Sequence, residues 1–357
     1  MIFHSKCRYY RRGLHSVDDG RLFMQVVVLA GGVGSRLRPW TNSVPKPLLP
    51  MLDRTLLEHV VSSLPPNLVD EVVVAGGYKV DMIQAYFNER DVPFDVRIVP
   101  EDKPLGTGGA LGNCRDVVSG TFACFNGDII SSLDASNLLD LHKKNESVGT
   151  LGLWEVDDPT RFGIVGLDEH NRITRFKEKP KPEEVFSNLI NAGSYIFNDE
   201  IFDWMPKGKH SIEREVFPEL AKAGLLSGEA FEGYFIDAGT PSAWNQGVKA
   251  CIEHQRYDTG SIVSTNWFQQ ENMHNGANVT DSMISKSCIL GNGRISQSSL
   301  LSEVTLGDGC QLDSCLVGKD VHIGANCTLN GVVIDHGSKI PEGTVLSGGQ
   351  WPLEEGQ

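Results

Sequence analysis

A run of β-branched apolar residues that ends abruptly in glycines places the strongest constraint on the fold. Residues 25–30 read Gln-Val-Val-Val-Leu-Ala, and residues 31–34 contain three glycines. Such a run is typical of a strand buried on both faces of a parallel sheet. Glycines after it let the backbone approach a ligand and turn its N–H groups inward. Arg36 and Lys46 can add charge-assisted contacts to phosphate oxygens, so we expect a phosphate-binding loop here.

The loop differs from two familiar glycine-rich phosphate motifs. Leu37 occupies the position of the third glycine in G-x-G-x-x-G, and the chain contains no G-x-x-x-x-G-K-[ST]. A glycine turn alone would also suit a simple strand-to-helix connection. Two cations at this spacing favour the phosphate site, because a turn without an anion has no need of them.

Composition and charge exclude several classes of protein. The 357 residues are 40% hydrophobic and 22% charged, which is typical of a globular protein, and the length suggests two domains. A net charge of −14 disfavours binding to nucleic acids or anionic membranes. No apolar run approaches the ~20 residues that span a bilayer.

The eight cysteines form no close C-x-x-C pair, and a chain of this size does not need disulfides. We therefore expect free thiols and a cytoplasmic protein. Residues 1–23 carry five basic residues but lack the apolar segment of a secretory signal. We interpret them as a disordered or leader-like extension, with Met24 as the functional start.

Apolar strands alternate with helical patterns from Gln25 onward, which indicates βαβ units and a mainly parallel sheet. The expected strands are 26–30, 71–75, 94–99 and 121–125, and the expected helices are 55–64, 80–88, 108–118 and 241–255. Ligands on such sheets bind at the carboxyl ends of strands. A β-rich insertion is expected from 149 to about 197. These elements predict a first domain over 24–257, and the resemblance described below implies that it is the catalytic domain.

Apolar residues recur every five or six positions in the last part of the chain, which is neither a helix nor a strand period. They are Ile284, Leu290, Ile295, Leu301, Leu306, Leu312, Val317, Ile323, Leu329, Ile334, Ile340 and Leu346. Hexapeptide repetition is typical of a parallel β-helix, here with three to four coils of about 18 residues. We expect this domain at 279–349, after a linker at 258–278. Cys288, Cys310, Cys315 and Cys327 lie in the repeats and are expected to be packed side chains.

Two acidic residues are placed to hold a metal ion. Asp128 follows a predicted strand in Asn126-Gly127-Asp128, and Asp237 ends an aromatic-rich strand in Gly233-Tyr-Phe-Ile-Asp237. Mg²⁺ in phosphate sites prefers one or two carboxylates together with phosphate oxygens and water. An N-G-D sequence is also a common turn, so this motif alone does not establish a metal site.

The segment Leu29–Pro47, L-A-G-G-V-G-S-R-L-R-P-W-T-N-S-V-P-K-P, resembles the signature of nucleotide-diphosphate-sugar pyrophosphorylases. Those enzymes join a sugar 1-phosphate to a nucleoside triphosphate and release pyrophosphate. The segment Ile334–Gly343 resembles the solenoids attached to many of them. The resemblance implies an α/β fold: a Rossmann-like, GT-A-like mixed sheet followed by a short left-handed parallel β-helix of hexapeptide repeats.

The resemblance also implies roles for individual residues. Arg36, Lys46 and Lys179 would be catalytic, and Asp128 and Asp237 would bind Mg²⁺. Lys179 and Glu178 lie in an E-K-P motif, and with Gly163 and Asn191 they would bind the sugar phosphate. The nucleotide would be bound by Leu29, Ala30, Gly31, Gly32, Gly34, Ser35, Glu101, Gly106, Thr107, Asn126 and Gly127. Taken alone, the charged run around Lys179 could equally be a solvated surface.

Glu101 bears on the identity of the base. A carboxylate only accepts hydrogen bonds, so it suits the adjacent N1–H and 2-amino donors of guanine, whereas uracil or thymine would favour an amide. The following segment P-L-G-T-G-G-A resembles guanylyltransferases for mannose and heptose 1-phosphates. Glu101 could instead be solvated beside Asp102.

We therefore expect an enzyme that converts GTP and mannose 1-phosphate to GDP-mannose. A heptose or cyclitol 1-phosphate, or a thymidylyl-, uridylyl- or adenylyltransferase for glucose 1-phosphate, remains an alternative. A regulatory subunit of a pyrophosphorylase complex is the non-enzymatic alternative, disfavoured by the intact set of charged residues. A homo-oligomer assembled through the solenoid is also expected.

Overall fold

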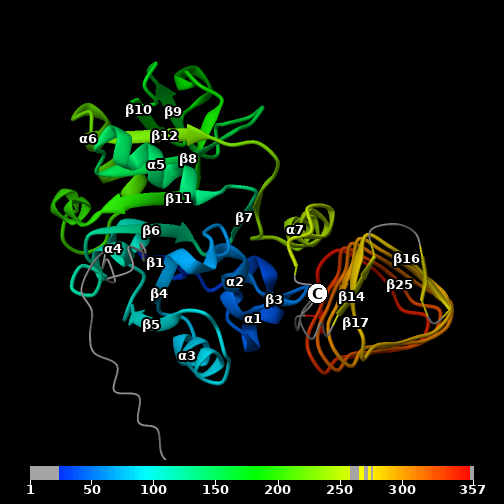
Figure 1. Ribbon diagram of the computed structural model, residues 1–357. Coiled ribbons are helices and arrows are strands. Elements are labelled where there is room, and N and C mark those ends of the chain that lie inside the picture. Colours follow the sequence, from blue (N-terminus) through cyan, green and yellow to red (C-terminus); the bar gives the residue numbers. More distant parts are fainter. Residues whose placement is uncertain (1–23, 258–264, 269–271, 275, 354–357) are drawn as a thin grey trace, which may run out of the picture.

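The computed structural model describes residues 24–257, 265–268, 272–274 and 276–353. Within them, a mixed α/β domain lies beside a three-sided solenoid of short strands (Figure 1). The predicted extension at 1–23 lies outside the described residues, as does the first part of the predicted linker, 258–264. No helix in the described part of the chain is both long and apolar enough to cross a lipid bilayer.

A nine-stranded sheet forms the centre of the N-terminal domain, in the order β10-β9-β11-β6-β1-β4-β5, with β8 and β12 attached through β11. Strands β6, β1, β4 and β5 are parallel, and β11 runs antiparallel to β6. The strands are β1 (Met24–Leu29), β4 (Val69–Gly76), β5 (Asp95–Pro100), β6 (Thr121–Asn126), β8 (Gly149–Glu155), β9 (Gly163–Leu167), β10 (Ile173–Glu178), β11 (Leu189–Asn198) and β12 (Leu226–Ala230).

Strand β1 lies in the interior of this sheet, between β4 and β6. Val26, Val27 and Val28 are fully buried. Val27 belongs to the hydrophobic cluster on one face of the sheet, and its two neighbours belong to the cluster on the other face. A strand covered on both faces has no polar side, which explains the uninterrupted β-branched run. The predicted α/β sheet is confirmed.

Seven α-helices are described: α1 (Trp40–Ser43), α2 (Leu56–Val61), α3 (Val80–Asn88), α4 (Gly106–Gly112), α5 (Ala135–Asn145), α6 (Phe217–Lys222) and α7 (Pro241–Glu253). The helix predicted at 108–118 is present as α4, but it begins two residues earlier and ends six residues earlier than predicted. Its early start depends on a distant contact: Gly108 and Gly109 donate their N–H groups to the carbonyl of His210. Sequence spacing gives no indication of that partner.

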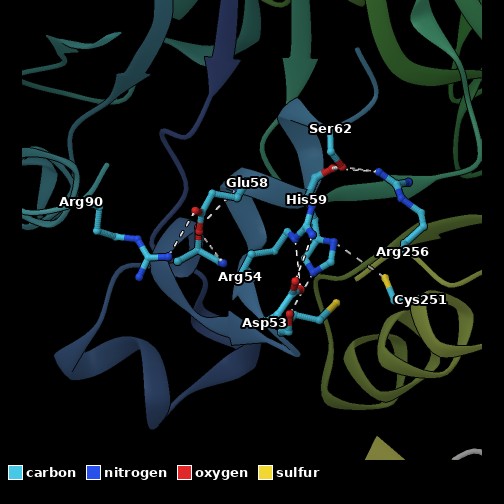
Figure 2. A network of polar contacts seen from close by, with 10 residues as sticks. Asp53, Arg54, Glu58, His59, Ser62, Arg90, Cys251 and Arg256 are labelled. Carbon is cyan, nitrogen blue, oxygen red and sulfur yellow. Dashed lines mark hydrogen bonds and ion pairs between the residues drawn. The ribbon is translucent and has the colours of Figure 1, made fainter. Parts of the chain in front are cut away.

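Helices α2 and α7 are joined by a buried polar network (Figure 2). His59 of α2 donates its Nε2–H to the Met51 carbonyl at 2.9 Å, and its Nδ1 lies 4.0 Å from Cys251 Sγ of α7. Just after α7, Arg256 donates to the His59 carbonyl and to Ser62 Oγ. The network therefore fixes the end of the N-terminal domain against helix α2.

Short strand pairs complete the N-terminal domain. They are β2 (Pro50–Met51) with β3 (Arg54–Thr55), and β7 (Ile129–Ser131) with β13 (Phe235–Asp237). The second pair is antiparallel and joins residues about one hundred positions apart. It therefore brings the segment after β6 beside the segment before α7.

The solenoid consists of three sheets. The first contains β14 (Thr265–Phe268), β17 (Ser282–Ser285), β20 (Ser299–Leu300), β23 (Leu316–Val317), β26 (Val333–Ile334) and β29 (Gln350–Trp351). The second contains β15 (Asn272–His274), β16 (Ala277–Thr280), β19 (Gly293–Ser296), β22 (Cys310–Asp313), β25 (Thr328–Asn330) and β28 (Val345–Ser347). The third contains β18 (Ile289–Leu290), β21 (Thr305–Leu306), β24 (His322–Ile323) and β27 (Lys339–Ile340).

The register advances regularly along the solenoid. In the first sheet Met283, Ser299, Leu316, Val333 and Gln350 are successive partners, so each coil takes 16 or 17 residues. These four steps agree with the predicted coils. Eleven of the twelve predicted apolar positions face the solenoid core. At the remaining position the core residue is Leu300, and the predicted Leu301 faces the catalytic domain instead.

Candidate active site

The glycine-rich loop after β1 forms one wall of a cleft of about 340 Å³ at the carboxyl end of the sheet. Of the predicted residues, the cleft is lined by Leu29, Ala30, Gly32, Gly34, Ser35, Arg36, Lys46, Gly127 and Asp128; Val33, Pro47 and Gly239 were not predicted. Gly34 has φ +66°, which suits glycine, and the Thr41 hydroxyl donates to its carbonyl at 2.9 Å. This hydrogen bond holds the turn of the loop.

Lys46 reaches this cleft from the next turn of the chain. Its side chain is buried, and its Nζ lies 2.8 Å from Asp128 Oδ2. Residues 82 positions apart therefore form a close ion pair at the tip of β6. A buried cation needs a partner such as Asp128 in the free protein. When a phosphate ligand binds, Lys46 can contact the phosphate as well as Asp128.

The second predicted carboxylate lies beside the first. In the β7–β13 pair Asp237 is opposite Ile129, and Ala238 donates its N–H to the Asp128 carbonyl at 2.9 Å. The pKa of Asp237 is raised by burial and then by the negative charge of Asp128; Lys46 and Arg36 partly offset the rise. Asp128, Lys46 and Arg36 therefore all lie close enough to Asp237 to influence its charge.

Gly239 lets Arg36 approach this carboxylate pair. A Cβ at position 239 would lie 2.6 Å from Arg36 Nη2 and 2.8 Å from Asp237 Oδ1. A side chain at position 239 would therefore displace the arginine or the carboxylate. Among the residues described, no group of three or more histidine, cysteine or acidic side chains could hold a metal ion. A divalent ion here would therefore take the two carboxylates and complete its shell with phosphate oxygens and water.

Glu101 lies against the glycine loop on another side. Its Oε2 accepts the Leu105 N–H at 3.2 Å, whereas its buried Oε1 has no partner among the described residues. A Cβ on Gly31 would lie 3.1 Å from that Oε1. Asn126, at the end of β6, likewise has a buried Oδ1 without a partner in the described part of the chain. Unpartnered buried acceptors are costly unless a ligand supplies donors.

The predicted nucleotide residues Gly106 and Thr107 lie at the start of α4. The Thr107 hydroxyl does not have a free hydrogen: it donates to Glu213 Oε2 at 2.6 Å and accepts the Ile212 N–H at 3.1 Å. The geometry makes Thr107 a support of the loop. Glu213 was not among the predicted site residues. The role of Glu213 depends on its contact with Thr107, which is 106 positions away in the sequence.

The predicted sugar residues surround the ends of β9, β10 and β11. Glu178 is paired with Gly163 across the sheet, and a Cβ on that glycine would lie 2.9 Å from Glu178 Oε2. The pKa of Glu178 is raised, first by burial and then by the charge of Glu213. Asn191 donates to the Tyr195 hydroxyl at 2.9 Å.

Lys179 lies apart from the other four charged residues. Its side chain is 58% exposed, and its Nζ lies 3.8 Å from Glu178 Oε1. The structure therefore brings Arg36, Lys46, Asp128 and Asp237 together and places Lys179 apart from them, beside Glu178. The loop after Asn191 connects the two sides, because a Cβ on Gly193 would lie 2.4 Å from Asn126 Nδ2.

A glycine-rich loop, two cations and two carboxylates at the edge of a mixed sheet, followed by a solenoid, are typical of enzymes that act on nucleoside phosphates. Residues 25–253 match the family model for nucleotidyl transferases, and residues 264–349 match the model described as a GlmU-like C-terminal hexapeptide. The chain therefore belongs to the nucleotidyl transferase family, and the predicted enzyme class is confirmed. Enzymes of this family generally use a divalent metal.

Several proteins of known activity are similar to the chain. Mannose-1-phosphate guanylyltransferase of Mycobacterium tuberculosis is 33% identical over 321 residues, which are 88% of this chain and 83% of that protein. Mannose-1-phosphate guanylyltransferase 1 of Arabidopsis thaliana is 29% identical over 91% of this chain and 82% of that protein. The solved structure of HddC from Yersinia pseudotuberculosis has a TM-score of 0.52 and 28% identity, and covers 63% of this chain and 98% of its own.

Proposed function

We propose that the protein converts GTP and mannose 1-phosphate to GDP-mannose and pyrophosphate. Arg36, Lys46 and Asp128 line one cleft and Asp237 lies beside Asp128, and this cluster of charges carries the proposal. An oxygen of the sugar phosphate attacks the α-phosphorus of GTP in line. The bond from the α-phosphorus to the bridging oxygen breaks, and pyrophosphate leaves. The reaction requires no protein nucleophile, because positioning and charge neutralisation lower the barrier.

Each cation has a separate task. Arg36, on the glycine loop, stabilises the β- and γ-phosphates as they become pyrophosphate. Lys46 exchanges part of its contact with Asp128 for a contact with the α-phosphate. Lys179, exposed beside Glu178, orients the phosphate of mannose 1-phosphate. Arg36 and Lys46 line the cleft, whereas Lys179 lies apart from it beside Glu178, as a group that orients the second substrate would.

Asp128 and Asp237 fit a resident Mg²⁺ ion. Both are carboxylates and they are adjacent through the β7–β13 pair, and two negative charges at such close range favour a cation between them. When bound, the ion neutralises charge on the phosphates. In its absence Lys46 is the nearest counter-charge to Asp128.

Glu101 supports guanine as the base. Its buried Oε1 needs donors, and guanine offers two adjacent ones on the edge that a carboxylate can accept. A Cβ on Gly31 would lie 3.1 Å from this oxygen, so glycine there keeps the space beside it free of a side chain. Mannose is the first choice of sugar because the similar guanylyltransferases act on mannose 1-phosphate.

The assay is pyrophosphate release by the full chain with Mg²⁺, testing five nucleoside triphosphates against mannose, glucose, heptose and cyclitol 1-phosphates. GTP with mannose 1-phosphate is expected to give the highest kcat/KM. Faster turnover of UTP or dTTP would overturn the assignment of Glu101. Absence of turnover with every pair would favour the regulatory-subunit alternative.

Replacing Glu101 tests the base directly. Glu101→Gln keeps an acceptor for Leu105 but presents an amide N–H₂ to the cleft, so kcat/KM for GTP is expected to fall about 10- to 100-fold, the effect of one charge-assisted hydrogen bond. UTP and dTTP should lose much less. The exposed neighbour Asp102 gives a matched control, because Asp102→Asn removes the same charge without changing the base pocket. Equal losses for GTP and UTP would count against base reading by Glu101.

We also propose that the protein is cytoplasmic and forms a homo-oligomer. The seven cysteines of the described residues are buried free thiols, which suits a reducing cytoplasm. The ends of the solenoid offer unpaired strands on which copies of the chain could associate into a homo-oligomer. Light scattering of the purified protein would test the second proposal, since a monomer at all concentrations would exclude it.

A further inference from the structure

Trp40 connects the phosphate loop to the solenoid. It follows the loop by one turn and is fully buried. Its Nε1 donates to the carbonyl of Ile334 in β26 at 2.9 Å. Its ring stacks on His336 of the solenoid, with centroids 6.2 Å apart and planes 24° apart, and meets the edge of Trp244 of α7. A side chain of the catalytic domain is therefore held by the other domain.

The contact belongs to an apolar interface. Leu37 and Trp40 share a cluster with four buried residues on the outward face of the first solenoid sheet: Met283, Leu301, Leu316 and Val333. Their chain neighbours Ile284, Leu300, Val317 and Ile334 fill the solenoid core. The sheet is thus buried on both faces, and the catalytic domain supplies the second cover.

Polar contacts fix the position of this interface. The Leu52 N–H lies 3.0 Å from Met283 Sδ, and Ser299 donates to Asn245 Oδ1 at 2.8 Å. Directional contacts of this kind define one arrangement of the two domains. Apolar contacts alone would allow one domain to slide over the other.

The same segment shapes the cleft. Arg36 and Leu37 are neighbours in a single short turn, with the arginine lining the cleft and the leucine in the interface. Thr41, next to Trp40, holds the Gly34 carbonyl. The segment from residue 34 to residue 41 therefore lies between the cleft and the solenoid.

We propose that Trp40 is a positioning residue through which the solenoid holds the phosphate loop in its ligand-binding conformation. Solenoid docking and polyphosphate binding are then coupled, and each favours the other. The proposal rests on the proposed nucleotide site but not on the identity of the base or the sugar.

The test uses Mg²⁺ with tripolyphosphate as the probe, in binding titrations of the full chain. This probe needs the phosphate loop alone, so it separates the coupling from a wrong choice of GTP or mannose 1-phosphate. Trp40→Phe keeps an aromatic ring but removes the donor to Ile334, and it is expected to weaken binding about 3- to 10-fold, as mutations on a coupling route do. Trp204→Phe, the same change at an exposed tryptophan, should bind like the parent.

A second variant acts from the solenoid side. His336→Ala removes the stacking partner without changing an atom of the catalytic domain, and binding should weaken in the same direction. In turnover assays both variants should raise KM for the nucleoside triphosphate and leave KM for the sugar phosphate unchanged. A merely structural role would lower the active fraction, and so kcat, without that split.

Parental binding by folded Trp40→Phe and by folded His336→Ala would overturn the proposal. Equal weakening in Trp204→Phe would do the same, since the effect would then be unspecific. If Trp40→Phe does not fold, the result for His336→Ala decides.

Discussion

Gly239 lies between the side chains of Arg36 and Asp237. A methyl group there would lie within 3 Å of both side chains. Gly239→Ala is therefore expected to displace the arginine and reduce kcat about 10- to 100-fold, a typical result of a misplaced catalytic group. The melting temperature should change little, because the nearest atom is the end of a flexible side chain. Pyrophosphate release and thermal unfolding measure the two effects.

Gly112→Ala in α4 is the control for this change. Its Cβ would find its nearest neighbour, Met205 Sδ, at 3.9 Å. Activity should stay parental and stability should hold or rise slightly, as for glycine to alanine in a helix. Parental activity of Gly239→Ala would show that Arg36 has room to act without this glycine.

The roles of some site residues can be predicted from the sequence, and the roles of others cannot. The glycine loop and its cations are local, and their spacing pointed to a phosphate site. Gly239 and Glu213 depend on neighbours about one to two hundred positions away, so no local pattern marks them. Thr107 shows the same limit: its place was predicted, but the partner of its hydroxyl was not.

Helix α2 contains the buried histidine of Figure 2. Burial lowers the pKa of His59 from 6.5 to about 3, so the folded protein keeps the ring neutral where the unfolded chain protonates it. As the pH falls below 6.5 the unfolded state therefore binds more protons, and the free energy of unfolding decreases by up to about 1.4 kcal/mol per pH unit. Above pH 6.5 this contribution is constant.

His59→Gln is expected to flatten that dependence, because glutamine can still donate to Met51 but does not titrate. Urea unfolding at pH 7, 6, 5 and 4 compares it with the parent and with His170→Gln, a change at an exposed histidine. The parent and His170→Gln should lose stability more steeply than His59→Gln. Identical slopes for all three would contradict the neutral buried ring.

Strands of the solenoid show what periodicity can and cannot predict. The repeat predicted the coils because each core position recurs at nearly constant spacing. It did not reveal the docking face, although consecutive apolar pairs such as Met283-Ile284 and Leu316-Val317 indicate strands buried on both sides. The prediction of Leu301 as a core residue was wrong because position 301 belongs to that outer face.

At the scale of the whole molecule, two domains meet behind the phosphate loop. The order of the domains and the fold class follow from motifs and repeats in the sequence. The orientation of the domains depends on Trp40, Leu52 and Asn245 meeting solenoid residues more than fifty positions away. Contacts across such separations are tertiary, and only the structure places them.

The central claim is that Asp128 and its charged neighbours form the catalytic centre, and Asp128→Asn tests it most directly. Pyrophosphate release from GTP and mannose 1-phosphate with Mg²⁺ should fall about 10²- to 10³-fold, the usual effect of removing a group that stabilises transition-state charge. Asp116→Asn, at an exposed position, should keep parental activity, and both variants should unfold cooperatively. Near-parental release by a folded Asp128→Asn protein would contradict the account.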